Sequence, residues 1–426
     1  MSRRAAVLGL VVGLSACGRA CKETPAAPDA AEVDNELLDA AMTTDEFSQE
    51  RCTLQGTPME LVAERNVEVG RAEVQADGTV LVGLVRNGEA AVATLRTSKD
   101  EVNFAKLDPL GPTLVYAPPP EVLLGGKTAY ALYYPLGAAD AGSGARRLRF
   151  VRLGPAGPAL DLPPESIDES MQFDGAFSGD DDALLAWDDL DGDHGVVHAV
   201  AFRHGALGEA HSYASGGADA TGPRVVPDKD GYWLLWSAKK VDLLPDGAPR
   251  QPPEHAIEGP GDLRSLDWID AQKVDRDGRP VGGVVHVTAT DGHVDVFEAV
   301  PLGADAFDVF ARDAARGGRP THVGVRGGKP GAAVVLPGPT MALGLPLLFP
   351  WKNDWLLYAD LADRTMLVPL NPSDRSATGG ASWERGFDDG EVLAALPGDD
   401  AEFLVLQMEN LPEGKGPLLR MARCRR

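Results

Sequence analysis

The most concentrated group of potentially reactive side chains in this sequence is an acidic stretch near its middle. Asp189, Asp191 and Asp193 stand at alternate positions around a glycine. Carboxylates spaced in this way within a tight loop can converge on one hard cation, and calcium prefers such oxygen ligands. These three residues are therefore our candidate metal ligands. The alternative is an ordinary polar hairpin loop whose carboxylates are solvated.

The details of this loop argue for weak calcium binding at most. The stretch resembles the start of an EF-hand-type loop, in which a glycine follows the third aspartate and a later glutamate completes the site. Here His194 occupies the glycine position and Val200 the glutamate position. We therefore expect at most a weak calcium site and predict no other cofactor.

Other catalytic patterns do not stand out in the sequence. The eight histidines are scattered at spacings that match no compact zinc pattern. No nucleophile elbow, Walker loop or dinucleotide fingerprint is evident. The formal net charge of −24 would repel nucleic acid, so we exclude nucleic acid as a partner. These observations favour a binding protein over an enzyme.

The N-terminus carries the features of an export signal. Arg3 and Arg4 precede the apolar run Ala5–Leu14, which is too short to span a bilayer. The run leads into the sequence Leu-Ser-Ala-Cys, which ends at Cys17 and resembles the bacterial lipobox. The resemblance implies that the Cys17 thiol receives a palmitate-type lipid, becomes the new N-terminus and tethers the protein to a membrane.

The residue after Cys17 bears on the membrane to which the protein is sorted. Gly18 stands where an aspartate would favour retention at the inner membrane. By resemblance to the enterobacterial sorting rule, we expect a lipid-anchored protein of the cell envelope, at the outer membrane.

Composition divides the chain into three parts. Residues 1–17 form the signal segment, and residues 18–47 form a flexible acidic stalk in which a short helix is possible. Residues 48–426 form the folded domain. The chain's 49 glycines and 33 prolines favour many short strands joined by turns.

Pairs of short apolar segments recur along the folded domain. The clearest pair is joined by Asn87-Gly88, which is the strongest local signal for a β-hairpin. The longest distance between successive pairs, from residue 284 to residue 354, also contains two weaker segments, His322–Val325 and Ala332–Leu336, which could form an eighth blade. A repeat of roughly 50 residues is typical of propeller blades. The seven pairs begin near residues 79, 128, 183, 231, 284, 354 and 402.

The repeats also share sequence. Leu-Leu-Ala-Trp at 184–187, Leu-Leu-Trp at 234–236 and Leu-Leu-Tyr at 356–358 each end a strand in an aromatic residue. The pattern resembles the blades of sialidase-like and related bacterial extracellular propellers. We therefore predict an all-β protein, a β-propeller with four-stranded antiparallel blades. Seven blades fit the spacing best, and six to eight are possible.

The cysteines bear on how such a ring closes. A propeller usually places a strand from one terminus beside strands from the other. Cys52 lies before an early apolar segment and Cys424 ends the last one. If these segments pair, the two cysteines come within bridging distance, with α-carbons about 5.5–6 Å apart. We predict a Cys52–Cys424 disulfide. The alternatives are a Cys21–Cys52 bridge and no disulfide.

Two functions remain open at this point. The first is a binding or scaffold module that presents a rigid propeller to an envelope protein or a glycan. The alternative is a carbohydrate- or peptidoglycan-directed hydrolase with its site at the propeller axis. Clustered acidic residues, arginine and tyrosine on the axis would favour the hydrolase. An axis lined by serine, threonine and alanine would favour the scaffold.

Overall fold

The structure is a computed structural model, and all its described residues belong to the compact unit Phe47–Arg426. Cys17, Cys21 and the possible helix near residues 34–47 lie outside the described residues. Within the described part of the chain, no helix is long and apolar enough to cross a membrane. The structure describes residues 52–98, 101–114, 116–137, 146–154, 159–167, 170–241, 265–313, 319–335, 347–351, 354–360, 365–370, 390–396, 401–408 and 411–424.

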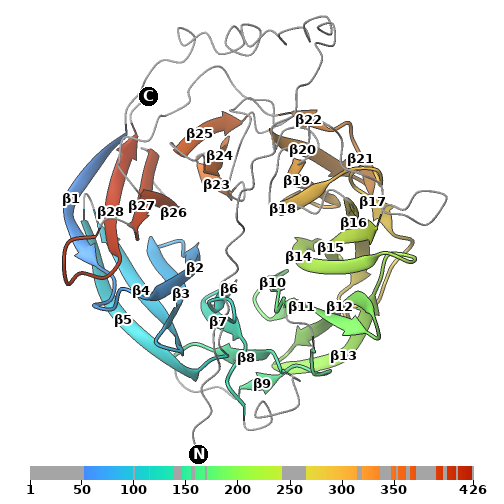
Figure 1. Cartoon of the computed structure of the whole chain (residues 1–426), viewed down its shortest axis with the longest axis horizontal. Coiled ribbons are helices and arrows are strands. Elements are labelled where there is room, and N and C mark those ends of the chain that lie inside the picture. Colours follow the sequence, from blue (N-terminus) through green and yellow to red (C-terminus); the bar gives the residue numbers. More distant parts are fainter. Residues whose placement is uncertain are drawn as a thin grey trace, which may run out of the picture. The chain divides into compact units, whose positions relative to one another are not determined.

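The described strands form seven antiparallel sheets, or blades, that follow one another around a central axis in Figure 1. Blade 1 contains β2 (Val67–Val74), β3 (Thr79–Arg86), β4 (Glu89–Ser98) and β5 (Glu101–Pro112). Blade 2 contains β6 (Glu121–Gly125), β7 (Thr128–Tyr133), β8 (Arg149–Arg152) and β9 (Leu160–Asp161). Blade 3 contains β10 (Phe173–Phe177), β11 (Asp182–Asp191), β12 (His194–Arg203) and β13 (Ala206–Tyr213).

The ring continues through three further blades. Blade 4 contains β14 (Asp219–Asp228), β15 (Gly231–Val241), β16 (Ser265–Asp275) and β17 (Val285–His286). Blade 5 contains β18 (Val294–Gly303), β19 (Ala306–Asp313), β20 (Arg319–Arg326), β21 (Lys329–Pro330) and β22 (Val334–Val335). Blade 6 has three described strands, β23 (Leu347–Trp351), β24 (Asp354–Asp360) and β25 (Thr365–Leu370).

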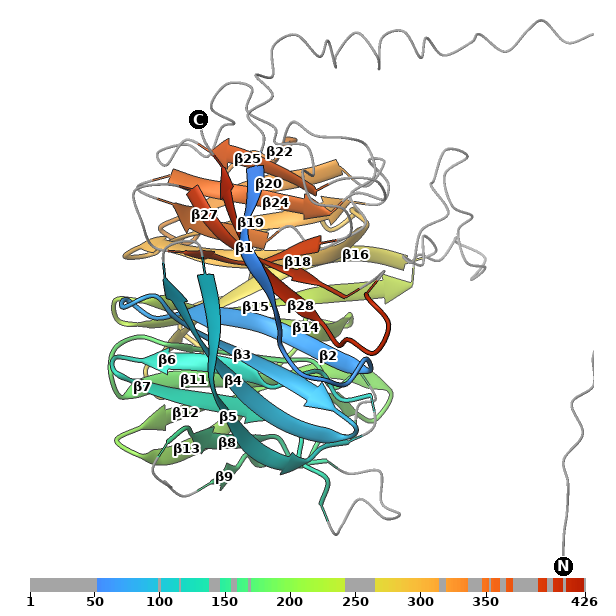
Figure 2. The same ribbon diagram turned by 90° about the vertical axis from the view of Figure 1, so that its left-hand side faces the viewer.

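The last blade closes the ring with strands from both ends of the domain. Blade 7 contains β26 (Gly390–Leu396), β27 (Ala401–Gln407), β28 (Leu418–Cys424) and the first strand of the domain, β1 (Cys52–Glu60). β1 lies against β28 in Figure 2, and Cys52 is the direct cross-strand partner of Cys424. The seven-bladed propeller predicted from the sequence is therefore the fold, and the pairing of its terminal segments is confirmed. The disulfide itself stays a prediction.

The hydrophobic core is divided among the junctions between blades. Trp187 of blade 3 is buried with Phe150 of blade 2, and Trp236 of blade 4 is buried with Val197 of blade 3. Trp187 and Trp236 therefore pack against a neighbouring blade, and they lie within β11 and β15 because these strands continue beyond the ends expected from the sequence. Blades 3 and 4 bury their faces against neighbouring blades in this way, as expected for a propeller.

Six of the seven expected hairpins pair as predicted. Asn87 and Gly88 join β3 to β4 with φ angles of 51° and 76°, the left-handed geometry of a two-residue hairpin turn. The other confirmed pairs are β7 with β8, β11 with β12, β15 with β16, β24 with β25, and β27 with β28.

The pair expected at residues 284–300 was wrong. β17 pairs with β16 of blade 4, whereas β18 pairs with β19 of blade 5. Asp291-Gly292 therefore turns the chain between two blades, because a turn signal does not reveal which strands it will join. The possible eighth blade was also wrong, since β22 pairs with β20 inside blade 5.

Candidate functional site

Charged residues on the innermost strands of five successive blades meet at the axis of the ring. The first strand of each of these blades is the innermost, and neighbouring inner strands contact one another. We name the charged residues that they contribute the axial cluster. It consists of Arg71 and Glu73 from β2, Glu121 from β6, Asp174 from β10, Arg224 from β14 and Glu298 from β18.

An ion pair that spans the ring shows that these side chains meet at the axis. Arg71 of blade 1 pairs with Glu298 of blade 5, although these blades are not neighbours. Arg224 approaches the same carboxylate, with 3.5 Å between its Nε and Glu298 Oε2. The guanidinium of Arg224 also lies 5.7 Å from the centre of the Phe297 ring. Glu298 thus holds two cations from opposite sides of the ring.

Irregularities in the inner strands aim the two arginines. The pairing of β2 with β3 shifts register between Val69 and Ala72, so Arg71 lies within a bulge. The pairing of β14 with β15 shifts between Thr221 and Arg224, where Gly222 has a φ of 61°. Bulges bend a strand and redirect its side chains, and they are frequent next to functional sites.

Two carboxyl groups of the cluster, those of Glu73 and Glu121, have raised pKa values. Burial raises the pKa of Glu73 to about 7, and the nearby negative charge of Asp174 adds to the effect while Arg71 opposes it. Burial also raises the pKa of Glu121 well above its ordinary value. Asp174 contributes to this second shift through its charge and through a hydrogen bond between the two carboxyl groups. The proton on Glu121 is therefore held more tightly than on an exposed glutamate.

The cluster changes the acidity of its buried cation as well. Burial lowers the pKa of the Arg224 guanidinium, and the positive charge of Arg71 acts in the same direction. Asp174, Glu121 and Asp188 oppose this shift. Groups whose pKa values are displaced by burial and by specific neighbours are concentrated at functional sites. The axial cluster can therefore hold an anion on arginine and can exchange protons through Glu73 and Glu121.

Asp174 also ties two blades together at the axis. Its Oδ2 accepts a hydrogen bond of 2.5 Å from the Val225 backbone N–H of blade 4. The neighbouring carboxylate of Asp188 accepts hydrogen bonds from the Gln172 N–H and the Ser170 hydroxyl. These contacts hold the carboxylates in fixed positions within the ring.

The residues predicted to bind calcium lie elsewhere, at the outer end of blade 3. β11 extends to Asp191, so the expected loop is only the Gly192-Asp193 turn. Asp191 and Asp193 are exposed, whereas Asp189 is only 5% exposed and accepts a hydrogen bond from the Ile167 N–H. Extension of β11 places Asp189 within the strand, opposite Val196 and away from the turn.

The remaining oxygen of Asp189 is also engaged. It lies 3.2 Å from His198 Nε2, and His198 Nδ1 lies 2.9 Å from the Ser212 hydroxyl oxygen. Among the described residues, no group of three or more histidine, cysteine, aspartate or glutamate side chains is arranged to hold a metal ion. Weak calcium binding at Asp189, Asp191 and Asp193 stays a prediction.

Sequence reasoning missed the axial cluster. Apart from Arg71 and Glu73 on β2, its members are single charged residues separated by tens to hundreds of positions, and none belongs to a recognisable motif. One signal was available: a charged residue next to glycine or proline at the start of a blade, as in Gly70-Arg71, Pro120-Glu121 and Pro223-Arg224. This pattern marks a bulge or a turn onto an inner strand.

No protein-family model matches the chain, and no curated protein matches it. Solved structures do match. The subtype N10 neuraminidase-like protein of A/little yellow-shouldered bat/Guatemala is 7% identical, with a TM-score of 0.41 over 72% of this chain and 94% of that one. Polysaccharide lyase Uly1 is 9% identical, with a TM-score of 0.48 over 87% of this chain and 100% of that one.

A third similar structure is the β-propeller domain of the Trilobed protease from Pyrococcus furiosus. It is 7% identical, with a TM-score of 0.45 over 84% of this chain and 93% of that domain. All three TM-scores lie below 0.5, so the likenesses carry nothing about activity. The assignment of the fold rests on the strand topology.

Proposed function

We propose that this protein is a lipid-anchored envelope protein whose propeller binds an acidic glycan at the axial cluster. The observation that carries the proposal is the convergence of Arg71 and Arg224 on the axis, from blades on different sides of the ring. Guanidinium groups bind carboxylates with good geometry through their planar fork of N–H donors. Arg71 is the accessible cation, because 39% of its side chain is exposed.

The choice of a glycan follows from the mixture of groups at the axis. A sugar acid offers a carboxylate for arginine and hydroxyls for the acidic side chains. The protein as a whole carries a net charge of −24, so a ligand that is mainly anionic gains little from long-range attraction. Recognition of a single carboxylate on a hydroxyl-rich ligand fits both observations.

Isothermal titration calorimetry with acidic and neutral oligosaccharides tests this proposal on the mature protein in detergent. We expect Arg71→Ala to weaken binding of the acidic sugar by at least tenfold, because it removes the accessible cation. Arg147→Ala is the matched control, since Arg147 pairs with Glu165 at the outside of blade 2. Equal binding by wild type and Arg71→Ala would rule out the axial cluster as the site.

A second candidate function is hydrolysis of such a glycan. The observation that favours it is the hydrogen-bonded pair of Glu121 and Asp174, with the pKa of Glu121 well above its ordinary value mainly because of burial. Glycosidases use a carboxyl group with a raised pKa as the general acid, together with a second carboxyl group. Release of reducing ends by wild type, with loss of turnover and retention of binding in Glu121→Gln, would support catalysis. Binding without turnover would indicate that the propeller is a binding module and does not hydrolyse the glycan.

The anchor and the address of the protein belong to the same proposal. Acylation of Cys17 would tether the propeller to the outer membrane and leave it free to engage an envelope glycan or an envelope protein. Several acyl chains on one cysteine give stable anchoring where one chain does not. Metabolic labelling with a fatty-acid analogue should tag the wild type and fail in Cys17→Ser. Persistent labelling of that variant would refute the anchor.

A further inference from the structure

A second cavity lies away from the axis, at the junction between blades 3 and 4. It has a volume of about 380 Å³, within the usual range for small-molecule sites. One wall is the hairpin of β12 and β13, and the other is the turn that follows β16. We name it the rim pocket, and its polar lining residues are Arg203, His204, Glu209, His211, Asp277 and Arg279.

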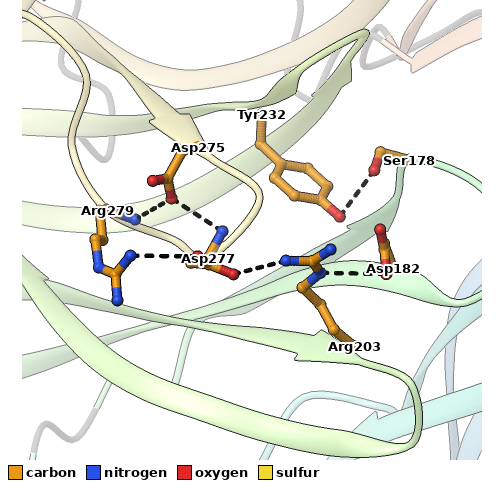
Figure 3. Close-up of polar contacts among 7 residues, drawn as sticks. All are labelled: Ser178, Asp182, Arg203, Tyr232, Asp275, Asp277 and Arg279. Carbon is orange, nitrogen blue, oxygen red and sulfur yellow. Dashed lines mark hydrogen bonds and ion pairs between the residues drawn. The ribbon is translucent and has the colours of Figure 1, made fainter.

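The turn after β16 holds its side chains in place before any ligand arrives. Asp275 Oδ1 accepts hydrogen bonds of 2.9 Å from the backbone N–H groups of both Asp277 and Arg279. Figure 3 shows how the carboxylate of Asp277 then lies between two guanidinium groups. Its distances are 2.7 Å to Arg203 Nη1 and 3.2 Å to Arg279 Nη1. The pocket therefore presents a fixed alternation of cation, anion and cation.

The position of Arg203, on the other side of Asp277, is also fixed by neighbouring residues. Arg203 also approaches Asp182, with 3.5 Å between Arg203 Nε and Asp182 Oδ1. Beside it, the Ser178 hydroxyl and the Tyr232 hydroxyl are hydrogen-bonded at 3.0 Å, which joins blade 3 to blade 4 (Figure 3). The pocket wall is thus built from two blades that are tied together.

Two histidines of the pocket have unusual environments. His211 Nε2 is buried and has no hydrogen-bond partner among the described residues. Buried polar groups are nearly always paired, so this nitrogen points to a missing partner. His204 has a φ of 51° in the turn between β12 and β13, a conformation that favours glycine or asparagine. The same left-handed geometry occurs at Asn87, so it is the ordinary geometry of a two-residue hairpin turn, and it sets the direction of the His204 side chain.

We infer that the rim pocket binds a neutral, hydroxyl-rich ligand, a single sugar unit. Its lining carries two arginines against Asp277 and Glu209, so a strongly charged ligand of either sign would meet a like charge. A sugar hydroxyl can accept from a guanidinium and donate to a carboxylate at once. It can also pair with an imidazole nitrogen, as His211 requires. Leu207 and the small residues beside it offer an apolar surface to the sugar ring.

Ligand-observed saturation-transfer NMR tests the inference on the mature protein in detergent micelles. The probes are methyl glucoside, methyl galactoside and N-acetylglucosamine, with sodium glucuronate and inorganic phosphate as anionic comparisons. We expect at least one neutral sugar to bind with a dissociation constant on the order of 1 mM. Arg279→Ala and His211→Phe should each weaken that binding at least tenfold.

Two control variants make the result specific. Arg276→Ala changes the same turn, but Arg276 bonds the Lys229 carbonyl and does not line the pocket, so its binding should be unchanged. Arg147→Ala should also leave sugar binding unchanged, because Arg147 pairs with Glu165 in an exposed setting and does not line the pocket. The inference is overturned if no neutral sugar binds, or if Arg276→Ala loses as much affinity as Arg279→Ala. It is also overturned if phosphate or glucuronate binds in preference and that binding is lost in Arg279→Ala, because anion binding that survives this change belongs to the proposed axial site.

Discussion

The axial cluster and the group at the rim pocket are built from the same residue types but behave differently. Arg224 and Glu298 at the axis are 17% and 7% exposed, whereas Arg203 and Asp277 at the rim are 34% and 47% exposed. Burial lowers the pKa of Arg224, while the hydrogen bond that Arg203 donates to Asp277 raises the pKa of Arg203. Burial, rather than the number of charges, therefore decides which group can do acid–base chemistry.

The comparison extends to how the ring is held together. At the axis, charged side chains from five blades compensate one another in a poorly solvated space, so the loss of one leaves others uncompensated. At the perimeter, the ring is closed by main-chain pairing of β1 with β28, and the half-exposed ion pairs add little. The two regions should respond very differently to substitution.

The largest effect is expected where the perimeter closes. Cys52 and Cys424 are direct partners of an antiparallel pair, whose α-carbon spacing of about 4.5–5.5 Å lies within the range of disulfides. Cys52→Ser should lower the free energy of unfolding by on the order of 5 kcal/mol, because the closed loop spans nearly the whole domain. Urea unfolding under non-reducing conditions measures the change.

The matched control for this prediction is Cys21→Ser, which should leave the stability unchanged. Non-reducing peptide mapping identifies the bridge directly. A Cys21–Cys52 peptide, or free thiols at both Cys52 and Cys424, would contradict closure of the ring by a disulfide.

The next largest effect is expected at the axis. Arg224→Leu removes a buried cation that compensates Glu298, Glu121 and Asp174. Removing one partner of a buried charge group typically costs about 3–5 kcal/mol. Urea unfolding at neutral pH measures it. A cost below that of a surface ion pair would mean that water reaches the axis freely, and the contrast with the rim would disappear.

The acidity of Glu73 predicts a smaller, pH-dependent effect. Its pKa is raised to about 7, mainly by burial, so the native state binds the proton more tightly than the unfolded state. Stability from this group is therefore fully present below the ordinary pKa near 4.5 and is lost as the pH rises through 7. We expect a loss of about 3 kcal/mol across this window in urea unfolding.

Glu73→Gln should flatten that dependence, because glutamine cannot lose the proton. Asp228, nearer the rim, predicts the opposite sign. Burial acts to raise its pKa, but hydrogen bonds from the Asp305 N–H and from Lys273 outweigh burial and lower it. Its contribution is present above pH 4 and is lost in acid. If the pH dependence of stability in Glu73→Gln matched that of the wild type, Glu73 would not be its source.

The smallest effect is expected for Arg203→Ala at the rim. Arg203 pairs with Asp182 and Asp277 in a half-exposed setting, and exposed pairs contribute about 0–1 kcal/mol. The change in unfolding free energy should shrink further in high salt. If Arg203→Ala proved as damaging as Arg224→Leu, the rim would be a second buried charge group.

The sequence alone determined the fold because propeller blades are local structures. The Asn87-Gly88 turn and the alternating apolar strands act within one blade, and the repeated aromatic residues Trp187 and Trp236 act between neighbouring blades. The cross-strand pairing of Cys52 with Cys424 was also predictable from the sequence, since closure of a ring requires its two ends to meet. Local signals failed at Asp291-Gly292, where the turn joins two blades.

Only the tertiary structure decided the candidate sites. Arg71 and Glu298 are far apart in the chain, and in the sequence each resembles an ordinary surface charge. They form an ion pair only because the closed ring brings the inner strands of blades 1 and 5 to a common axis. The extension of β11 likewise buried Asp189 against His198, which the spacing of aspartates could not reveal. Strand patterns are set by neighbouring residues, whereas burial of a charge depends on every blade that surrounds it, and burial controls its chemistry.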